Sequence, residues 1–131
     1  MLFTKRTYDN IGSLASIIQI KGQVMMEYKL IEIEQAPEEI QEWIENNKHL
    51  ETYMTFHTEE KTYVVIMRGE MMTGGYGIEV LRVDETDDHI LIAVQYINPL
   101  PDQMGIQMIS YPYVIIELDP TDKEIIIEIQ K

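Results

Sequence analysis

The chain contains no cysteine among its 131 residues. This absence excludes disulfide bonds, thiolate metal sites and a cysteine nucleophile, and it fits a reducing compartment. Histidine is scarce as well, and His49, His57 and His89 show none of the spacings at which histidines bind a metal together. We therefore expect no metal and no cofactor.

The chain also has few basic residues: 10, against 23 acidic ones, which gives a formal charge of −13. Such a surface repels phosphate backbones and anionic lipid headgroups, so nucleic acid and membranes are disfavoured as partners. The longest apolar-rich stretch, residues 91–100, is interrupted by Gln95 and Asn98 and is much shorter than a membrane span. Because residues 7–13 are too polar for the apolar part of a signal peptide, we expect a cytoplasmic protein.

The composition that is present is that of an ordinary folded domain, 45% apolar and 25% charged. This mixture differs from the polar, highly charged composition of disordered chains, and the length suits one domain rather than two. We expect residues 1–131 to form a single domain. Residues 1–50 would hold N-terminal strands and a helix, and residues 56–131 a β-rich region.

Apolar alternation predicts strands along most of the chain. The expected strands lie at residues 15–20, 24–34, 52–57, 62–68, 78–83, 90–97, 114–118 and 124–129, with a further short one at 2–6. Ile31-Glu32-Ile33-Glu34 is the clearest alternating segment, and residues 90–97 are apolar on both faces, which predicts a central strand. Turns of hairpin length separate most of these strands. The predicted fold class is therefore mainly β (α+β), an antiparallel β-sandwich or partly closed barrel of about eight short strands.

One amphipathic helix is predicted at about residues 37–47. Pro37 suits the first helical turn, and the two glutamates after it favour the positive end of the helix dipole. Ile40, Trp43 and Ile44 then fall on one face of the helix. We expect this face to pack on an open face or end of the sheet.

Four of the seven glycines fall within residues 69–77, between two predicted strands. Such a concentration indicates a loop whose main-chain path is tightly prescribed. The loop is either a tight turn with a bulge or an exposed loop that presents Met71, Met72 and Tyr76 to a partner.

Residues 98–112 also interrupt the strand pattern, because they contain three prolines. Long irregular segments in compact domains are often functional. This one carries Leu100, Met104, Ile106 and Met108. These apolar side chains must either pack on the domain or contact a partner.

No catalytic constellation is recognisable in the sequence. Ser13, Ser16 and Ser110 lack the flanking glycines of a nucleophile elbow. With 23 acidic residues in the chain, a neighbouring pair carries no information without geometry. We expect no enzymatic activity, and an unrecognised carboxylate site is the enzymatic alternative.

Several short motifs in the second half are ordered and spaced as in a known family. They are Tyr63-Val64-Val65, Gly69-Glu70, Thr73-Gly74-Gly75-Tyr76, Pro99, Pro101, Gln107 and Ser110-Tyr111-Pro112-Tyr113. On these residues the span from about Phe56 to Lys131 resembles the C-terminal domain of PrcB-like proteins, a family named after an accessory subunit of a bacterial surface protease complex. The resemblance implies a β-rich, non-catalytic domain that associates with or stabilises a protease. A fainter likeness links Thr-Gly-Gly-Tyr to the loop of chagasin-like protease inhibitors.

The leading hypothesis is a non-catalytic protein-binding module, an accessory, stabilising or inhibitory partner of a protease, that binds through residues 69–77 and 98–112. The residues expected to contact the partner are Met71, Met72, Thr73, Gly74, Gly75, Tyr76, Met104, Tyr111 and Tyr113. The last two tyrosines are expected to pack against Tyr76. A small-ligand-binding, β-barrel-like protein is the alternative function.

A homodimer is a further open alternative. The terminal strand at 124–129 contains little proline or lysine to protect an exposed sheet edge.

Overall fold

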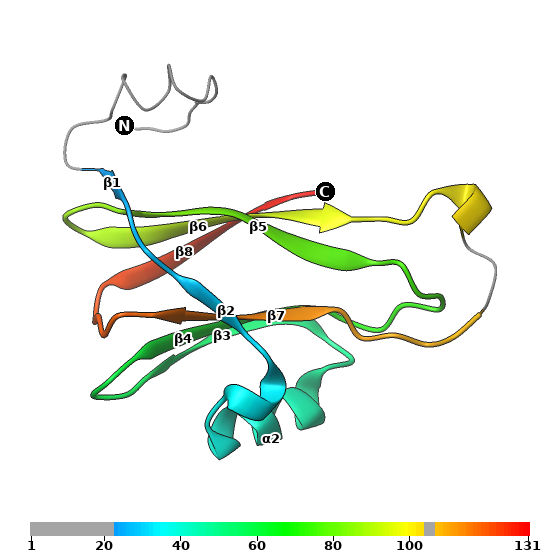
Figure 1. Ribbon diagram of the computed structural model, residues 1–131, viewed down its shortest axis with the longest axis horizontal. Helices are drawn as coiled ribbons and strands as arrows, with labels where there is room; N and C mark the ends of the chain where they lie inside the picture. The colour runs from blue at the N-terminus through cyan, green and yellow to red at the C-terminus, as the bar shows by residue number, and fades with distance from the viewer. Residues whose placement is uncertain (1–22, 104–106) are drawn as a thin grey trace.

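The computed structural model describes residues 23–103 and 107–131, which form two stacked four-stranded sheets and a helix on one of them (Figure 1). Sheet A has the strand order β1-β5-β6-β8, and sheet B has the order β2-β7-β4-β3. The strands are β1 (Val24–Met25), β2 (Lys29–Ile31), β3 (Glu51–His57), β4 (Thr62–Arg68), β5 (Gly77–Glu85), β6 (His89–Ile97), β7 (Tyr113–Leu118) and β8 (Glu124–Gln130). The predicted β-sandwich is confirmed, because the described strands form two separate sheets rather than a closed barrel.

Strand β4 lies inside sheet B, and its residues 62–67 are all buried. Because successive side chains of a strand point to opposite faces, β4 contributes to two apolar cores. Val64 and Ile66 pack towards sheet A, where Ile92 and Val94 of β6 face them. Buried apolar side chains from both sheets therefore meet in the space where the alternative function would need a ligand cavity.

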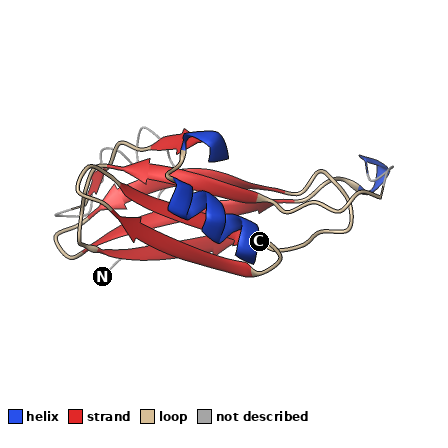
Figure 2. Ribbon diagram, turned by 90° about the horizontal axis from the view of Figure 1, so that it is seen from below, coloured by secondary structure: helices blue, strands red, loops and turns tan. Residues whose placement is uncertain are grey.

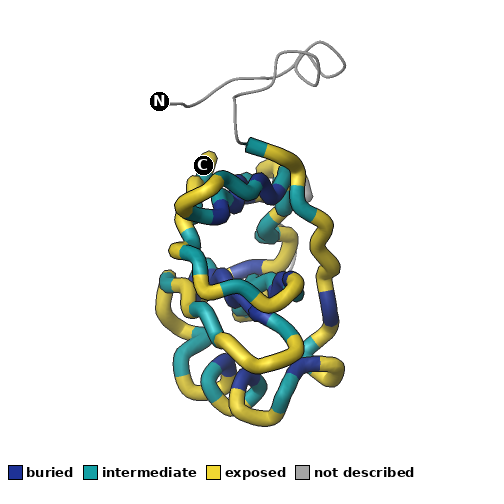
Figure 3. The backbone as a smooth tube through the Cα atoms, turned by 90° about the vertical axis from the view of Figure 1, so that its left-hand side faces the viewer, coloured by how far each residue is buried: buried dark blue, intermediate teal, exposed yellow. Residues whose placement is uncertain are grey.

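The other face of sheet B is covered by helix α2 (Glu38–Asn47), as Figure 2 shows. Ile40 and Ile44 are each only 1% exposed and pack with Tyr63, Val65 and Met67 of β4. The predicted helix is thus confirmed, with the expected face buried. Figure 3 shows how the buried residues follow these layers, with exposed residues on the outside.

Trp43, the remaining residue of the predicted apolar face, is half-buried at the margin of this core. Its ring meets that of Phe56 edge-on, with 5.8 Å between centroids. Edge-to-face contacts of this kind add to the stabilisation from apolar burial.

The strand predicted over residues 24–34 is interrupted after Met25 and ends at Ile31. It is divided into β1 and β2, and the chain then forms a short 3-10 helix, η1 (Ile33–Gln35). The side chain of Gln35 accepts a hydrogen bond from the backbone N–H of Glu32 (2.9 Å), which favours this turn over a strand. The turn carries the chain from the edge of sheet B to α2. The strands predicted at 2–6 and 15–20 lie outside the described residues.

One strand pair departs from the predicted antiparallel arrangement, because β8 pairs with β6 in parallel. The link between β7 and β8 is as short as a hairpin turn, yet it carries the chain from sheet B to sheet A. The hydroxyl of Thr62 fastens this link: it donates to the carbonyl oxygen of Thr121 (3.2 Å) and accepts from its N–H (3.0 Å).

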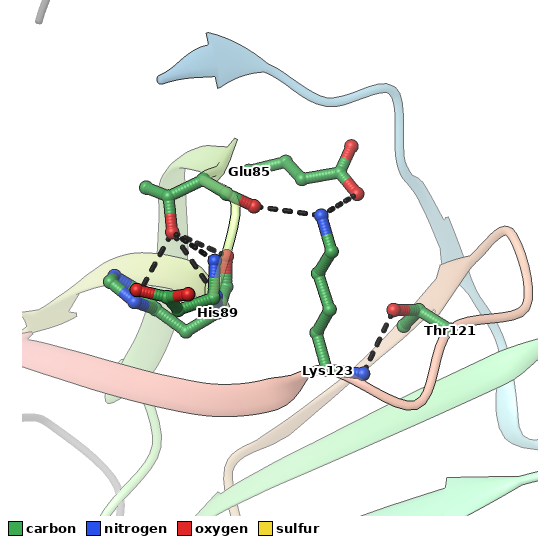
Figure 4. Close-up of polar contacts among 6 residues, drawn as sticks. Glu85, His89, Thr121 and Lys123 are labelled. Atoms are coloured by element: carbon green, nitrogen blue, oxygen red, sulfur yellow. Dashed lines mark hydrogen bonds and ion pairs between the residues drawn. The ribbon is translucent and has the colours of Figure 1, made fainter. Parts of the chain in front are cut away.

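Lys123, at the end of the same link, holds the start of β8 against the β5–β6 turn (Figure 4). Its ammonium group donates to the Glu85 carboxylate (2.9 Å) and to the backbone carbonyl oxygen of Thr86 (2.7 Å). This contact orients the start of β8 beside β6. The predicted central position of β6 is confirmed, since it pairs with β5 on one side and with β8 on the other.

Replacing Ile44 with alanine should lower the free energy of unfolding by about 2–5 kcal/mol, because it leaves a cavity between α2 and sheet B. Urea denaturation measures this change. Glu42→Ala is the matched control, since Glu42 is exposed on the same helix. Equal stability of the two variants would contradict the packing described for α2.

Candidate protein-binding surface

The two irregular segments lie together at one end of the molecule (Figure 1). Residues 69–77 connect β4 to β5, and residues 98–112 connect β6 to β7. Their backbones are joined by a pair of hydrogen bonds between Met71 and Ser110, of 2.8 and 2.9 Å, and the Ser110 hydroxyl donates to the carbonyl oxygen of Thr73 (2.9 Å). We call the described part of the two segments, residues 69–77, 98–103 and 107–112, the loop end.

Gly75 brings the two segments into close contact. Its φ angle is +92°, a conformation that L-residues with a side chain rarely adopt. A Cβ atom at this position would lie 2.7 Å from the Cβ of Pro99, on the other segment. Gly75 is therefore required by the close contact between the two segments.

Arg68, the last residue of β4, links the start of the glycine loop to the start of the second segment. Its guanidinium group donates to the carbonyl oxygens of Gly77 (3.2 Å) and Ile97 (2.9 Å) and to the side-chain oxygen of Asn98 (2.9 Å). Three hydrogen bonds from one cation to two connections hold both segments in a defined position. The sequence analysis missed this residue, although it directly precedes the glycine loop.

The guanidinium group of Arg68 also lies against two tyrosine rings. Its central carbon is 4.1 Å from the ring centroid of Tyr96 and 5.2 Å from that of Tyr76. Such cation–π contacts stabilise by about 0.5–2 kcal/mol, depending on exposure. Tyr76, which the sequence analysis assigned to the partner, is thus half-buried against the frame of the loop end.

The phenol of Tyr96 donates a hydrogen bond to the Glu51 carboxylate (2.8 Å). The pKa of Tyr96 is raised from 10.0 to about 12, mainly by burial and also by the hydrogen bond and negative charge of Glu51, against the lowering effect of Arg68. The same carboxylate lies 3.8 Å from the ammonium group of Lys131. Glu51, at the start of β3, therefore accepts a hydrogen bond from β6 and forms an ion pair with Lys131.

Four large apolar side chains of the loop end are exposed. Their exposed fractions are 63% for Met72, 60% for Leu100, 65% for Met108 and 49% for Ile109. They come from both segments, so the contact between the segments places them at the same end of the molecule. Met72 is the residue of the predicted set that the structure presents most openly.

The other predicted residues of the glycine loop differ in their environments. Thr73 is only 7% exposed, and within the described part of the chain its hydroxyl has no hydrogen-bond partner. Met71 is half-buried, whereas Gly74 is exposed with open space around its Cα. Met104 lies outside the described residues.

The predicted packing of Tyr111 and Tyr113 against Tyr76 is wrong. Tyr111 donates a hydrogen bond to the Glu70 carboxylate (3.3 Å), and the ammonium group of Lys48 lies 4.8 Å from its ring centroid. Tyr113 belongs to β7 and packs, half-buried, against the core beneath α2. The pleat of β7 directs this side chain to the helix side of sheet B, away from the glycine loop.

The described residues contain no group of three or more histidine, cysteine or acidic side chains arranged to hold a metal ion. Within the same ranges, no helix has the length and apolar character needed to cross a membrane. The loop end presents exposed thioether and aliphatic side chains on a hydrogen-bonded frame.

Gly75→Ala should lower the free energy of unfolding by about 1–3 kcal/mol, because it combines an unfavourable φ angle with a contact against Pro99. Gly74→Ala is the matched control, since a Cβ at Gly74 meets no atom within 4 Å. Thermal denaturation of the two variants checks this difference. Equal midpoints would contradict the close contact between the two segments.

The raised pKa of Tyr96 predicts a loss of stability at high pH. The folded state favours the neutral phenol, so its contribution is complete below the ordinary tyrosine pKa of 10.0 and is lost as the pH rises towards about 12. In an absorbance titration at tyrosinate wavelengths, Tyr96 should ionise last, and Tyr96→Phe should remove the final phase. A final phase that survives the substitution would refute the assignment.

Comparison with known proteins bears on the same part of the chain. Residues 62–119 match the family model described as PrcB C-terminal. The matched span begins with β4, contains the whole loop end and ends directly after β7.

A relative was found in Methanocaldococcus jannaschii, the uncharacterized protein MJ1373. It is 29% identical over 69 residues, which cover 53% of this chain and 41% of that protein. This chain thus spans less than half the length of the relative. No solved structure matches the chain. The predicted resemblance is therefore confirmed: over residues 62–119 this chain matches the PrcB C-terminal family.

Proposed function

We propose that this chain is a non-catalytic protein-binding module that docks on a protease, or on a protease-containing complex, through the loop end. The match to the PrcB C-terminal family supports the association with a protease complex. The observation that carries the choice of surface is the exposure of Met72, Leu100, Met108 and Ile109 on two segments that are fastened to each other.

The frame beneath these side chains supports a role in binding. A partner that meets flexible loops must bear the entropic cost of ordering them, whereas a loop already held in place avoids most of that cost. Here Arg68 and Ser110 fix the two segments by side-chain hydrogen bonds, and Gly75 packs against Pro99. The exposed methionines add adaptable apolar contacts to this fixed support.

The charge of the two segments indicates the chemistry of the partner surface. Residues 69–77 and 98–112 contain the acids Glu70 and Asp102 and no lysine or arginine. Both acids are exposed. The complementary partner surface is an apolar patch flanked by basic side chains, and attraction to the net charge of −13 would speed the encounter.

The test is affinity capture from the source cells with the tagged chain, followed by identification of retained proteases. The double variant Met72→Asp, Met108→Asp should retain the protease at least about tenfold less, as expected when central apolar contacts are lost. The matched control is Met25→Asp, Met54→Asp, which adds the same charges at two other exposed methionines.

The thermal midpoints of both double variants should equal that of the unchanged protein, since all four side chains are exposed. Equal loss of capture by the two double variants would show a general effect of charge and would refute the assignment to the loop end. Retention of non-proteolytic proteins alone would refute the protease as partner.

A further inference from the structure

Strand β8 forms one edge of sheet A, and no strand of the described residues pairs with its outer side. Natural edge strands are commonly protected from further pairing by proline, lysine, bulges or short length. The seven residues of β8, Glu124–Gln130, contain neither proline nor lysine, and their pairing with β6 shows no shift of register. This edge is regular and open to another strand.

The core-facing isoleucines of β8 are incompletely covered. Ile125, Ile127 and Ile129 pack against the core between the sheets, yet all three stay half-buried. The corresponding residues of the neighbouring strand β6, such as Ile90 and Ile92, are 0% exposed. The difference arises because β6 has a strand on each side, whereas β8 has one. A further strand along β8 would complete the burial of the three isoleucines.

The positions of the charged side chains on β8 determine the register in which a second strand can pair with this edge. Two copies of β8 that pair antiparallel about a two-fold axis at Ile127 place Ile127 opposite Ile127 and Ile125 opposite Ile129. On the outer face, Glu124 then lies opposite Gln130, and Ile126 opposite Glu128. No two carboxylates face each other.

The neighbouring two-fold registers are worse. An axis at Ile126 places Glu124 opposite Glu128 twice, and an axis at Glu128 places two copies of Glu128 opposite each other. Like charges directly across an antiparallel pair are destabilising. Of these three registers, only the one centred on Ile127 places no two carboxylates opposite each other.

We propose that β8 pairs antiparallel with β8 of a second copy of this chain, in the register centred on Ile127, so that the two A sheets form one continuous sheet. Each copy carries a formal charge of −13, which opposes the association at low ionic strength. Salt screens this repulsion, since the Debye length falls from about 10 Å at 0.1 M to about 3 Å at 1 M. The dimer is accordingly strengthened by salt.

Sedimentation equilibrium over a range of protein concentrations, at low and high sodium chloride, tests the association. A monomer–dimer equilibrium that shifts to the dimer with salt is the expected result. Hydrogen exchange should show protection of β8 amides that rises with concentration, with no such change in β3, the corresponding edge of sheet B. A monomer under all conditions would overturn the proposal, as would a dimer that protects β3 instead.

A charge pair at Ile126 tests the register. This side chain is 37% exposed and in the proposed register lies opposite Glu128 of the other copy. Ile126→Lys should therefore bind its own copy at least about fivefold more tightly than Ile126→Glu, because each dimer holds two such pairs. Leu81→Lys and Leu81→Glu are the matched controls, since Leu81 is 40% exposed on β5 and reports the effect of net charge alone.

The difference between the two Ile126 variants should exceed that between the two Leu81 variants. If both Ile126 variants weaken the dimer equally, position 126 faces its own copy and the proposed register is wrong. The loop-end variants with aspartate at Met72 and Met108 should dimerise normally, so that failure of this proposal is separable from failure of the protease-binding proposal.

Discussion

The fold depends on the burial of β4 on both of its faces. One face of this strand packs against sheet A, and the other packs against α2. Sheet B is therefore the middle of three layers, and β4 contacts both outer layers. Apolar burial of this extent is the main source of stability in a small domain. It also fixes the register of β4, because a shift by one residue would exchange the two cores. The position of Arg68 at the end of β4 follows directly from that register.

The position of β4 determines the geometry of the loop end. Arg68 leaves the core at a defined point, and its guanidinium group binds the carbonyl oxygens of both connections. The loop end therefore contains two kinds of residue. Arg68, Thr73, Gly75 and Ser110 hold the segments in place, whereas Met72 and Met108 project from them. The residues that hold the glycine loop in place are thus different from the residues that it exposes.

The sequence was sufficient to predict the elements whose pattern is local. The bounds of strand β4 and helix α2 were predicted almost to the residue. The apolar patterns that indicate a strand or a helix depend only on residues that are close together in the sequence. The parallel pairing of β8 with β6 could not be predicted in this way, since it depends on hydrogen bonds between Thr62 and Thr121, 59 positions apart. The alternation of apolar and polar residues also predicted a strand at Ile33, where the side chain of Gln35 instead stabilises a turn.

The same limit applies to the candidate site. Composition identified the glycine loop and residues 98–112 as unusual, and the structure brings them together through Met71 and Ser110. Which tyrosine contacts which residue was beyond the sequence, because it depends on the face of the sheet to which each side chain points. Arg68 was overlooked for a related reason: nothing in its neighbours indicates that it reaches Asn98, 30 positions away.

The order of strands in the sheets has a consequence for how the chain folds. β1 pairs with β5 and β2 pairs with β7, so the first described strands find their partners only after most of the chain has followed them. Contacts between residues remote in sequence require closure of long loops and slow folding to the millisecond-to-second range typical of β-sandwiches. During synthesis, β1 must remain unpaired until β5 leaves the ribosome, and β2 until β7 does. The hairpins of β3 with β4 and of β5 with β6 are the described parts of the chain whose contacts are local enough to form first.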